Sequence, residues 1–208
     1  MRHDAMFFAR WLRDPRGMGS VVPSGRTLAL AMAEPAARAY KTPILELGGG
    51  TGTVTEALFE CGLDPHDLIV IERDAQLHRH LELRFPQVRV VRGDAAHAHR
   101  LLAELGVDAV GGVVSSLPLL SMPLLARRRI LGSAFRSLGA DGFLLQFTYG
   151  PLSPLPDRML TTLALRGRVI DRVWRNVPPA TVWRYERVPS QSAAVPQPDP
   201  LADPSASP

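Results

Sequence analysis

A glycine-rich loop that begins with an acidic residue has the residue types best suited to binding a ligand. It spans Glu46–Gly52 (ELGGGTG), follows a short apolar run and precedes a helical pattern. Glycines let the backbone turn tightly and approach a ligand closely, and the N-terminus of the next helix favours a negative group. Dinucleotide-binding enzymes place a pyrophosphate at such a loop. The loop therefore predicts a cofactor site.

Two further acidic residues follow later apolar runs. Glu72 ends the run Leu68–Glu72, twenty positions after Gly52, where a carboxylate can accept hydrogen bonds from both hydroxyls of a ribose. Asp94 lies in Gly93-Asp94-Ala95, directly after the third run. Elements at three consecutive strand ends share one edge of a parallel sheet. Together they strengthen the prediction of a nucleotide-type cofactor.

The stretch between Pro43 and Pro189 alternates apolar runs with helical patterns, which is typical of an α/β fold. Only the segment around Asn176–Ala180 separates the last two expected strands, which predicts an antiparallel hairpin. The expected strands are Ile44–Leu47, Leu68–Glu72, Val88–Val91, Ala109–Val114, Phe143–Tyr149, Val169–Val173 and Thr181–Arg187, and the expected helices are Thr53–Cys61, Ala75–Phe85, His97–Leu105, Leu124–Leu138 and Arg158–Leu165.

This order of elements resembles the class I methyltransferase fold, a Rossmann-like α/β fold with a seven-stranded, mostly parallel sheet and a C-terminal antiparallel hairpin. The acidic residue two positions before the first glycine resembles the loop by which that superfamily binds S-adenosylmethionine. The resemblance implies that Glu46 meets the methionine ammonium, Glu72 the ribose and Asp94 the adenine amino group. A nicotinamide-dependent enzyme with a similar fold is the alternative. The expected cofactor-binding residues are Glu46, Gly48, Gly50, Thr51, Gly52, Glu72, Arg73, Gly93, Asp94, Ala95 and Ser115.

The segment after the fourth expected strand, Ser115-Ser116-Leu117-Pro118-Leu119-Leu120, bears on the acceptor. Enzymes that methylate adenine N6 usually carry an amide side chain and an aromatic residue at this place. Here Ser116 replaces the amide and Leu119 the aromatic residue, so a flipped base would lose both partners. The apolar character favours a lipid-like acceptor, and core packing of the leucines is the alternative.

Several segments together resemble the bacterial phospholipid N-methyltransferases, which convert phosphatidylethanolamine to phosphatidylcholine. The resemblance runs from about Phe7 to Arg187. Two residues depart from it: Gly25, where a second serine is usual, and Gly49, where proline is usual. The matching segments are Val22-Pro23-Ser24, Ser116-Leu117-Pro118-Leu119, Thr148-Tyr149-Gly150-Pro151 and Val182-Trp183-Arg184-Tyr185.

These segments supply expected roles in methylating the ethanolamine nitrogen. Tyr149, at the end of the fifth strand, is expected to orient the amine or accept its proton, and Ser116 to accept a hydrogen bond from it. A packed aromatic residue is the alternative for Tyr149. The expected substrate-binding residues are Ser24 and Leu117, with Arg26 or Arg184 holding the lipid phosphate.

The length of 208 residues favours one compact domain. We expect N-terminal lid helices (1–42), a cofactor-binding domain (43–189) and a disordered tail rich in Pro, Ala and Ser (190–208). The formal net charge is +4, and almost all of the positive charge is arginine, which suits a phosphate-bearing partner, either nucleic acid or anionic lipid; an ordinary solvated surface is the alternative. The single cysteine, Cys61, excludes an intramolecular disulfide, and the spacing of the histidines predicts no metal site.

The N-terminal stretch Met1–Asp14 combines aromatic residues with arginines in an amphipathic pattern. Such a helix can lie in the interface of an anionic membrane, and a helix that caps its own domain is the alternative. We therefore expect a cytoplasmic protein, peripheral on the inner face of the cytoplasmic membrane, with a phospholipid substrate and no nucleic acid partner. A ribosomal RNA adenine N6-methyltransferase and a non-catalytic peripheral membrane module are the competing interpretations.

Overall fold

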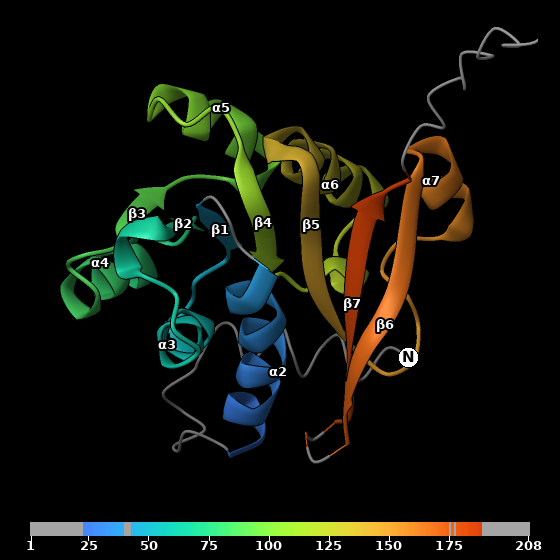
Figure 1. Cartoon of the computed structure of the whole chain (residues 1–208), viewed down its shortest axis with the longest axis horizontal. Helices are drawn as coiled ribbons and strands as arrows, with labels where there is room; N and C mark the ends of the chain where they lie inside the picture. Colours follow the sequence, from blue (N-terminus) through green and yellow to red (C-terminus); the bar gives the residue numbers. More distant parts are fainter. Residues whose placement is uncertain (1–22, 40–42, 175, 177, 189–208) are drawn as a thin grey trace, which may run out of the picture.

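The computed structural model describes residues 23–39, 43–174, 176 and 178–188. They form one sheet with helices on both of its faces (Figure 1). The expected amphipathic stretch Met1–Asp14 and the expected tail 190–208 lie outside the described residues.

The sheet has seven strands in the order β3-β2-β1-β4-β5-β7-β6. Strands β1 to β5 pair in parallel, whereas β7 runs antiparallel to both β5 and β6. The predicted Rossmann-like methyltransferase fold with a C-terminal antiparallel hairpin is thereby confirmed. The strands are β1 (Ile44–Leu47), β2 (Leu68–Glu72), β3 (Arg89–Arg92), β4 (Val110–Ser115), β5 (Leu138–Tyr149), β6 (Leu165–Val173) and β7 (Ala180–Arg187).

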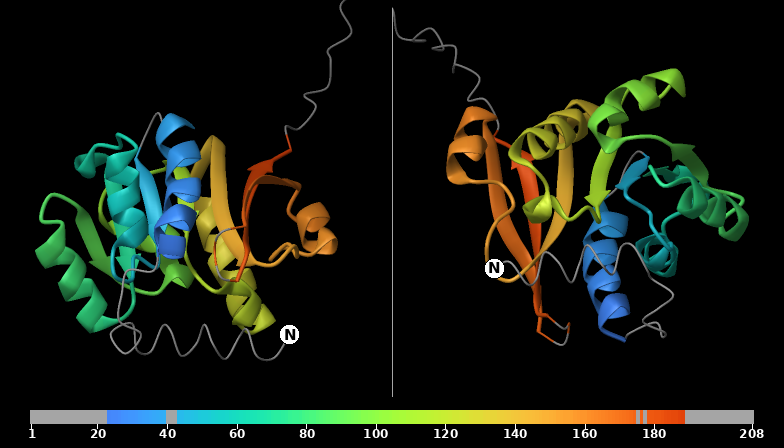
Figure 2. Two further views of the ribbon diagram at one scale, coloured as in Figure 1. Left: turned by 90° about the horizontal axis from the view of Figure 1, so that it is seen from below. Right: turned by 180° about the vertical axis from the view of Figure 1, so that it is seen from behind.

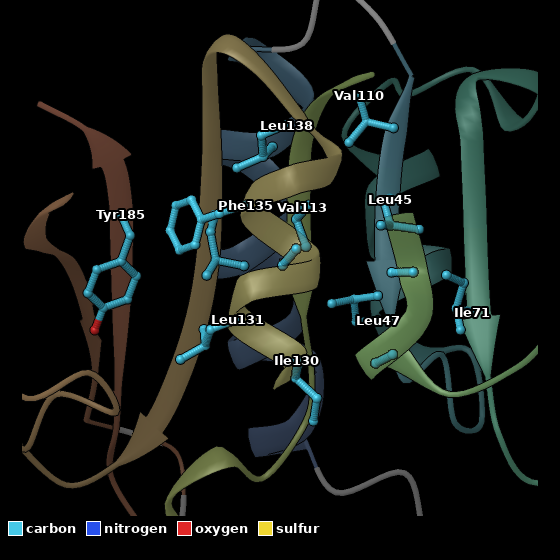
Figure 3. Close-up of a cluster of buried hydrophobic side chains, with 14 of the residues drawn as sticks. Leu45, Leu47, Ile71, Val110, Val113, Ile130, Leu131, Phe135, Leu138 and Tyr185 are labelled. Carbon is cyan, nitrogen blue, oxygen red and sulfur yellow. The ribbon is translucent and has the colours of Figure 1, made fainter. Parts of the chain in front are cut away.

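Helices cover the two faces of the sheet and divide the core into two layers. On one face α6 packs Ile130, Leu131 and Phe135 toward Leu45 and Val113 of the sheet (Figure 3). On the other face α2, α3 and α4 pack against the opposite sides of the same strands. The helices are α2 (Pro23–Ala39), α3 (Thr53–Glu60), α4 (Ala75–Arg84), α5 (Ala98–Glu104), α6 (Leu124–Ser137) and α7 (Asp157–Thr162), with short 3-10 turns η1 (Pro65–Asp67), η2 (Ala95–His97) and η3 (Leu119–Ser121).

The strands at the hairpin side of the sheet are longer than the sequence pattern predicted. Strand β5 begins five residues before the predicted Phe143, and β6 begins at Leu165 rather than at Val169. Most residues of β6 are exposed or half-buried, because β6 is an edge strand. A search for continuous apolar runs finds strands that are buried on both faces, and it misses an edge strand that carries arginines.

Helix α2 packs on one face of the sheet and extends past the edge where the parallel strands end. Its apolar side, which includes Leu28, Met32 and Ala36, packs on the second core layer. In Figures 1 and 2, α2 and the end of the β6–β7 hairpin both extend past the carboxyl end of β4. Among the described residues no helix is long and apolar enough to cross a membrane.

Candidate cofactor site and acceptor edge

The carboxyl ends of the parallel strands bring the predicted site residues to one edge. Leu47 pairs with Ile71 on one side and with Ser115 on the other, and Ser115 pairs with Gln146 of β5. The glycine loop, Glu72 and the segment after β4 therefore begin at the same level of the sheet. Ligands of open α/β sheets bind at this edge.

The glycine loop is shaped by contacts that only glycine allows. Gly48 has φ +78, and a Cβ there would lie 2.7 Å from Cδ2 of Leu117. A Cβ on Gly49 would lie 2.5 Å from Cγ1 of Val70 and 2.8 Å from Cδ1 of Leu81. The proline that is usual at position 49 in phospholipid N-methyltransferases would therefore not fit here unless Val70 and Leu81 moved.

Glu72 holds the glycine loop with its carboxylate. Its Oε2 accepts a hydrogen bond of 3.0 Å from the backbone N–H of Gly50, and its Oε1 accepts one of 2.8 Å from that of Asp74. Each carboxylate oxygen has a second lone pair, so Glu72 can accept further hydrogen bonds from a ribose. Thus Glu72 both shapes the loop and remains able to bind a diol.

Glu46 is a fully buried carboxylate at the end of β1. Thr55 of α3 donates a hydrogen bond of 2.7 Å to its Oε2, and Oε1 has no hydrogen-bond partner in the described part of the chain. Desolvation by burial raises the pKa of Glu46 from its usual 4.5 to about 7, the hydrogen bond from Thr55 opposes the shift, and the nearby Glu72 charge adds to it. A buried carboxylate with a bare oxygen lacks a cationic partner, and an ammonium group would supply one.

Asp94 lies two residues after the end of β3, at the carboxyl edge of the sheet. Its Oδ1 accepts a hydrogen bond of 2.8 Å from the N–H of Ala96, which caps the turn η2, and its Oδ2 has no hydrogen-bond partner within the described residues. The N–H of Gly93 donates to the carbonyl of Glu72 at 3.0 Å and so ties the ends of β2 and β3. Ala95 is buried beneath this turn, whereas Arg73 is exposed at the start of α4.

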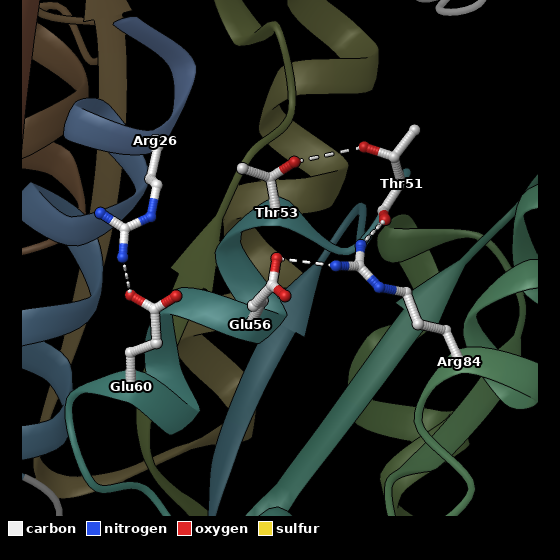
Figure 4. Close-up of polar contacts among 6 residues, drawn as sticks. All are labelled: Arg26, Thr51, Thr53, Glu56, Glu60 and Arg84. Atoms are coloured by element: carbon white, nitrogen blue, oxygen red, sulfur yellow. Dashed lines mark hydrogen bonds and ion pairs between the residues drawn. The ribbon is translucent and has the colours of Figure 1, made fainter. Parts of the chain in front are cut away.

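Arg84 of α4 supports the loop from outside, and nothing in the sequence pattern singled it out. Its Nη1 donates to the carbonyl of Thr51 at 2.8 Å, and its Nη2 contacts Glu56 of α3 at 2.7 Å (Figure 4). The hydroxyls of Thr51 and Thr53 lie 3.3 Å apart. Arg84 therefore links the last turn of α4 to the loop and to α3.

The segment after β4 is held by two residues that the sequence analysis missed. Gln146 donates from Nε2 to the carbonyls of Leu117 (2.9 Å) and Phe147 (2.8 Å). Arg127 donates to the carbonyls of Leu119 (3.0 Å), Leu120 (3.3 Å) and Pro154 (3.1 Å). Both residues become recognisable only when segments far apart in sequence meet.

At this edge of the sheet three buried polar atoms have no hydrogen-bond partner among the described residues: Oγ of Ser115, Oγ of Ser116 and Oε1 of Gln146. All three come from β4, β5 or the residue after β4, and Ser115 and Gln146 are register partners. Buried polar atoms without partners are costly unless a ligand or water satisfies them. Leu119, by contrast, is part of the hydrophobic core, as the core alternative for the leucines expected.

Tyr149 ends β5 on the same edge. Burial raises the pKa of its hydroxyl above the usual 10, and a side-chain hydrogen bond with Asn176 opposes that shift. A hydroxyl with a raised pKa is a poor proton acceptor, because its phenolate form is disfavoured. The raised pKa of Tyr149 therefore favours a role in orienting an amine over removal of its proton.

The two arginines expected to hold a phosphate are engaged elsewhere. Arg26 forms an ion pair of 2.6 Å with Glu60 of α3 (Figure 4). Arg184 pairs with Glu186 and lies over the ring of Phe143, at the level of Leu145 in the middle of β5. Ser24 lies in the first turn of α2. The described residues contain no cluster of three or more His, Cys, Asp or Glu side chains placed to hold a metal ion.

Comparison with known proteins supports the fold. No protein family model matches the chain. A curated ornithine lipid N-methyltransferase of Singulisphaera acidiphila is 27% identical over 154 residues, which are 73% of this chain and 80% of that protein. A TehB-like SAM-dependent methyltransferase of Corynebacterium glutamicum has a TM-score of 0.58 and 19% identity, covering 90% of this chain and 100% of that one.

A second solved structure, the 1,6-didemethyltoxoflavin-N1-methyltransferase of Burkholderia thailandensis with bound S-adenosylhomocysteine, has a TM-score of 0.62 and 15% identity. It covers 88% of this chain and 87% of that one. The chain therefore has the fold of S-adenosylmethionine-dependent methyltransferases.

Proposed function

We propose that this protein is an S-adenosylmethionine-dependent N-methyltransferase whose acceptor is the amine of a membrane lipid. The observation that carries the cofactor part is the buried Glu46 carboxylate with one bare oxygen, at the strand end that precedes the glycine loop. A cation beside that oxygen supplies the missing partner and lowers the pKa of the Glu46 carboxyl group. The methionine ammonium is such a cation.

The other cofactor contacts follow from the same edge. Glu72 has spare lone pairs for the ribose hydroxyls, and Asp94 has an oxygen available for the adenine amino group. The positive φ angles of Gly48, Gly50 and Gly52 keep side chains out of the loop. A nicotinamide cofactor would bring a pyrophosphate close to the buried Glu46 carboxylate, which disfavours a second anion.

The acceptor part is supported by the segment after β4 and by the relative that methylates ornithine lipid. The buried hydroxyl of Ser116, which has no partner among the described residues, can accept a hydrogen bond from an amine N–H. Positions 116 and 119 carry Ser and Leu, not the amide and the aromatic residue that would bind a nucleobase. The cofactor supplies a methyl group on a cationic sulfur. The protein's contribution is to hold the uncharged amine in line with that methyl, with Ser116 and the Tyr149 hydroxyl as the orienting groups.

Exposed leucines support a membrane as the source of the acceptor. Leu120, Leu124 and Leu125 stand at η3 and the first turn of α6, and Leu152 follows β5. Each is 41% to 62% exposed. Arg128 and Arg129 are exposed one helical turn behind Leu124 and Leu125. The exposed leucines and the arginines that follow them about 6 Å along the helix axis are spaced to match the depth of a membrane interface.

A labelled-methyl assay tests the proposed function. Purified protein is offered phosphatidylethanolamine, its monomethyl and dimethyl forms, ornithine lipid and ribosomal RNA, each with labelled S-adenosylmethionine. Label in at least one amine-bearing lipid and none in RNA is expected. Label in RNA alone would overturn the lipid acceptor, and calorimetric binding of NADH without binding of S-adenosylmethionine would overturn the cofactor.

Vesicle flotation tests the membrane part. The double variant Leu124→Ser, Leu125→Ser is compared with Leu83→Ser, which changes a leucine on α4 that is 75% exposed. The double variant is expected to lose binding to anionic vesicles, whereas Leu83→Ser keeps it. A variant without Met1–Asp14 measures the share of the expected N-terminal helix. Equal flotation of the wild type and both leucine variants would contradict the role of the leucines.

A further inference from the structure

A cavity of about 390 Å³ opens beside the acceptor edge, where β5 and β6 end and β7 begins. Tyr149 forms one wall, Trp174 another, and the prolines that precede β7 a third. This volume falls within the range of small-molecule sites, roughly 300–1,000 Å³. None of the roles assigned above uses this cavity, apart from the shared Tyr149.

The frame of the cavity is already formed by hydrogen bonds. The N–H of Gly150 donates to the carbonyl of Pro179 at 3.0 Å, and the hydroxyl of Thr181 donates to the carbonyl of Gly150 at 2.8 Å. The side chain of the buried Asn176 bonds Tyr149 and donates to the carbonyl of Pro178 at 2.7 Å. The backbone at Gly150 and at the prolines is therefore held in place before a ligand arrives, which lowers the entropic cost of binding.

Arg172 gives this largely apolar cavity one charge. It contributes to the lining, it is exposed, and no ion pair engages its guanidinium within the described residues. The two arginines first expected to bind an anion are already paired with Glu60 and Glu186. Arg172 is thus a guanidinium beside the acceptor edge that has room for an anion.

We propose that this cavity binds the acidic group of the acceptor lipid, with Arg172 as its anion contact and Trp174 and the prolines against its apolar part. This inference rests on the proposed function. Phosphatidylethanolamine carries a phosphate and ornithine lipid a carboxylate within a few bonds of the amine. Tyr149 lines the cavity and also ends β5 at the acceptor edge, so an anion on Arg172 would hold the lipid headgroup beside that strand end.

Steady-state kinetics with Arg172→Gln test the subsite. The acceptors are short-chain phosphatidylethanolamine and short-chain ornithine lipid, both below the concentration at which they aggregate. Arg168→Gln is the control, because it removes an exposed arginine from the same strand outside the cavity. KM for the accepted lipid is expected to rise about 10- to 100-fold in Arg172→Gln, as for the loss of a charge-assisted hydrogen bond. The KM of Arg168→Gln and the affinity of either variant for S-adenosylmethionine are expected to stay at the wild-type value.

The two lipids distinguish the anion. A KM increase with the phosphate lipid alone identifies a phosphate site, and an increase with the carboxylate lipid alone identifies a carboxylate site. Equal KM values for Arg172→Gln and Arg168→Gln with every accepted lipid overturn the proposal. So does a result in which Arg172→Gln lowers vesicle flotation but keeps the KM of the dispersed lipids, because Arg172 would then contact the bilayer surface.

A binding measurement separates this proposal from the proposed function. Titration of dispersed short-chain lipid is followed by tryptophan emission, with Trp174→Phe to assign the signal to the cavity wall. A Trp174-dependent change that Arg172→Gln weakens supports the subsite even if no lipid is methylated. Methylation of lipid by the wild type, without such a change, supports the proposed function and contradicts the subsite.

Discussion

Thr55 on α3 donates a hydrogen bond of 2.7 Å to Glu46, a carboxylate that is completely buried at the end of β1. The hydroxyl satisfies one oxygen and leaves the other without a partner among the residues described. One neutral donor does not compensate for the desolvation of a charge, so the pKa of Glu46 rises to about 7. The protein without ligand therefore holds Glu46 partly protonated near neutral pH.

The raised pKa makes the stability of the ligand-free protein depend on pH. Between pH 4.5 and 7 the folded state keeps the proton of Glu46 and the unfolded state loses it, so the free energy of unfolding falls as pH rises through this window. The full effect is about 3 kcal/mol, because one pKa unit corresponds to about 1.4 kcal/mol.

In Glu46→Gln the amide oxygen still accepts the Thr55 hydrogen bond, and the titration is absent. Urea unfolding at pH 5 to 8 is expected to show that the variant gains stability over the wild type as pH rises. Parallel stability curves for the two proteins would contradict the raised pKa.

The same carboxyl group should make cofactor binding depend on pH. An ammonium prefers the ionised form of Glu46, so below pH 7 binding must displace a proton from the carboxyl group. The affinity for S-adenosylmethionine is expected to fall up to about tenfold per pH unit below 7 and to level off above it. Calorimetry from pH 5.5 to 8.5 measures this slope.

Two controls sharpen that measurement. Glu46→Gln is expected to bind weakly at pH 8 and to lose the slope, because it removes both the charge and the titration. Thr55→Val removes the hydrogen bond that opposes the shift and should move the midpoint to higher pH. A slope retained in Glu46→Gln would assign the titration to another group.

Glu72 is expected to affect the cofactor through the loop as well as through direct contact. In Glu72→Gln one carboxylate oxygen becomes an NH2 group facing the N–H of either Gly50 or Asp74, so one hydrogen bond is lost. A loss of about 1–3 kcal/mol, roughly 5- to 150-fold in affinity for S-adenosylhomocysteine, is expected. Asp74→Asn keeps the cap of α4 and should bind as the wild type does.

The cofactor edge was predictable because its information is local. A glycine loop, its preceding strand and an acidic residue at a strand end lie within a few residues of one another, and parallel pairing places successive strand ends side by side. Glu46, Glu72 and Asp94 could therefore be assigned to one edge before the fold was known. The strands β1 and β2 were also predicted at their observed bounds, because they are buried on both faces.

The acceptor side was less predictable because its contacts cross long sequence distances. Gln146 reaches Leu117 across 29 positions, and Asn176 meets Tyr149 only because β7 folds back along β5. No periodicity marks such a polar residue. Arg184 shows the converse case: its segment resembled a family motif, but its place in the middle of an antiparallel pair gives it Glu186 and Phe143 as partners.

Arg127 provides the last prediction, because it connects the two loops that border the acceptor edge. Its guanidinium bonds the carbonyls of Leu119 and Leu120 after β4 and that of Pro154 after β5. In Arg127→Met the aliphatic packing is largely kept and these bonds are lost. The methyl-transfer rate is expected to fall at least tenfold, while the affinity for S-adenosylmethionine stays within about twofold, since no Arg127 bond reaches the glycine loop.

Amide hydrogen exchange identifies the cause of that loss. Exchange is expected to accelerate at residues 119–122, at Ser153 and at Leu155 in Arg127→Met and to remain unchanged in Arg128→Met, which alters the exposed neighbouring arginine. If the methyl-transfer rate falls without faster exchange in these loops, the loss of the Arg127 hydrogen bonds is not the cause. If exchange accelerates and the rate is unchanged, the acceptor is positioned by Gln146 and Ser116 without the help of Arg127, because Gln146 still holds the carbonyl of Leu117.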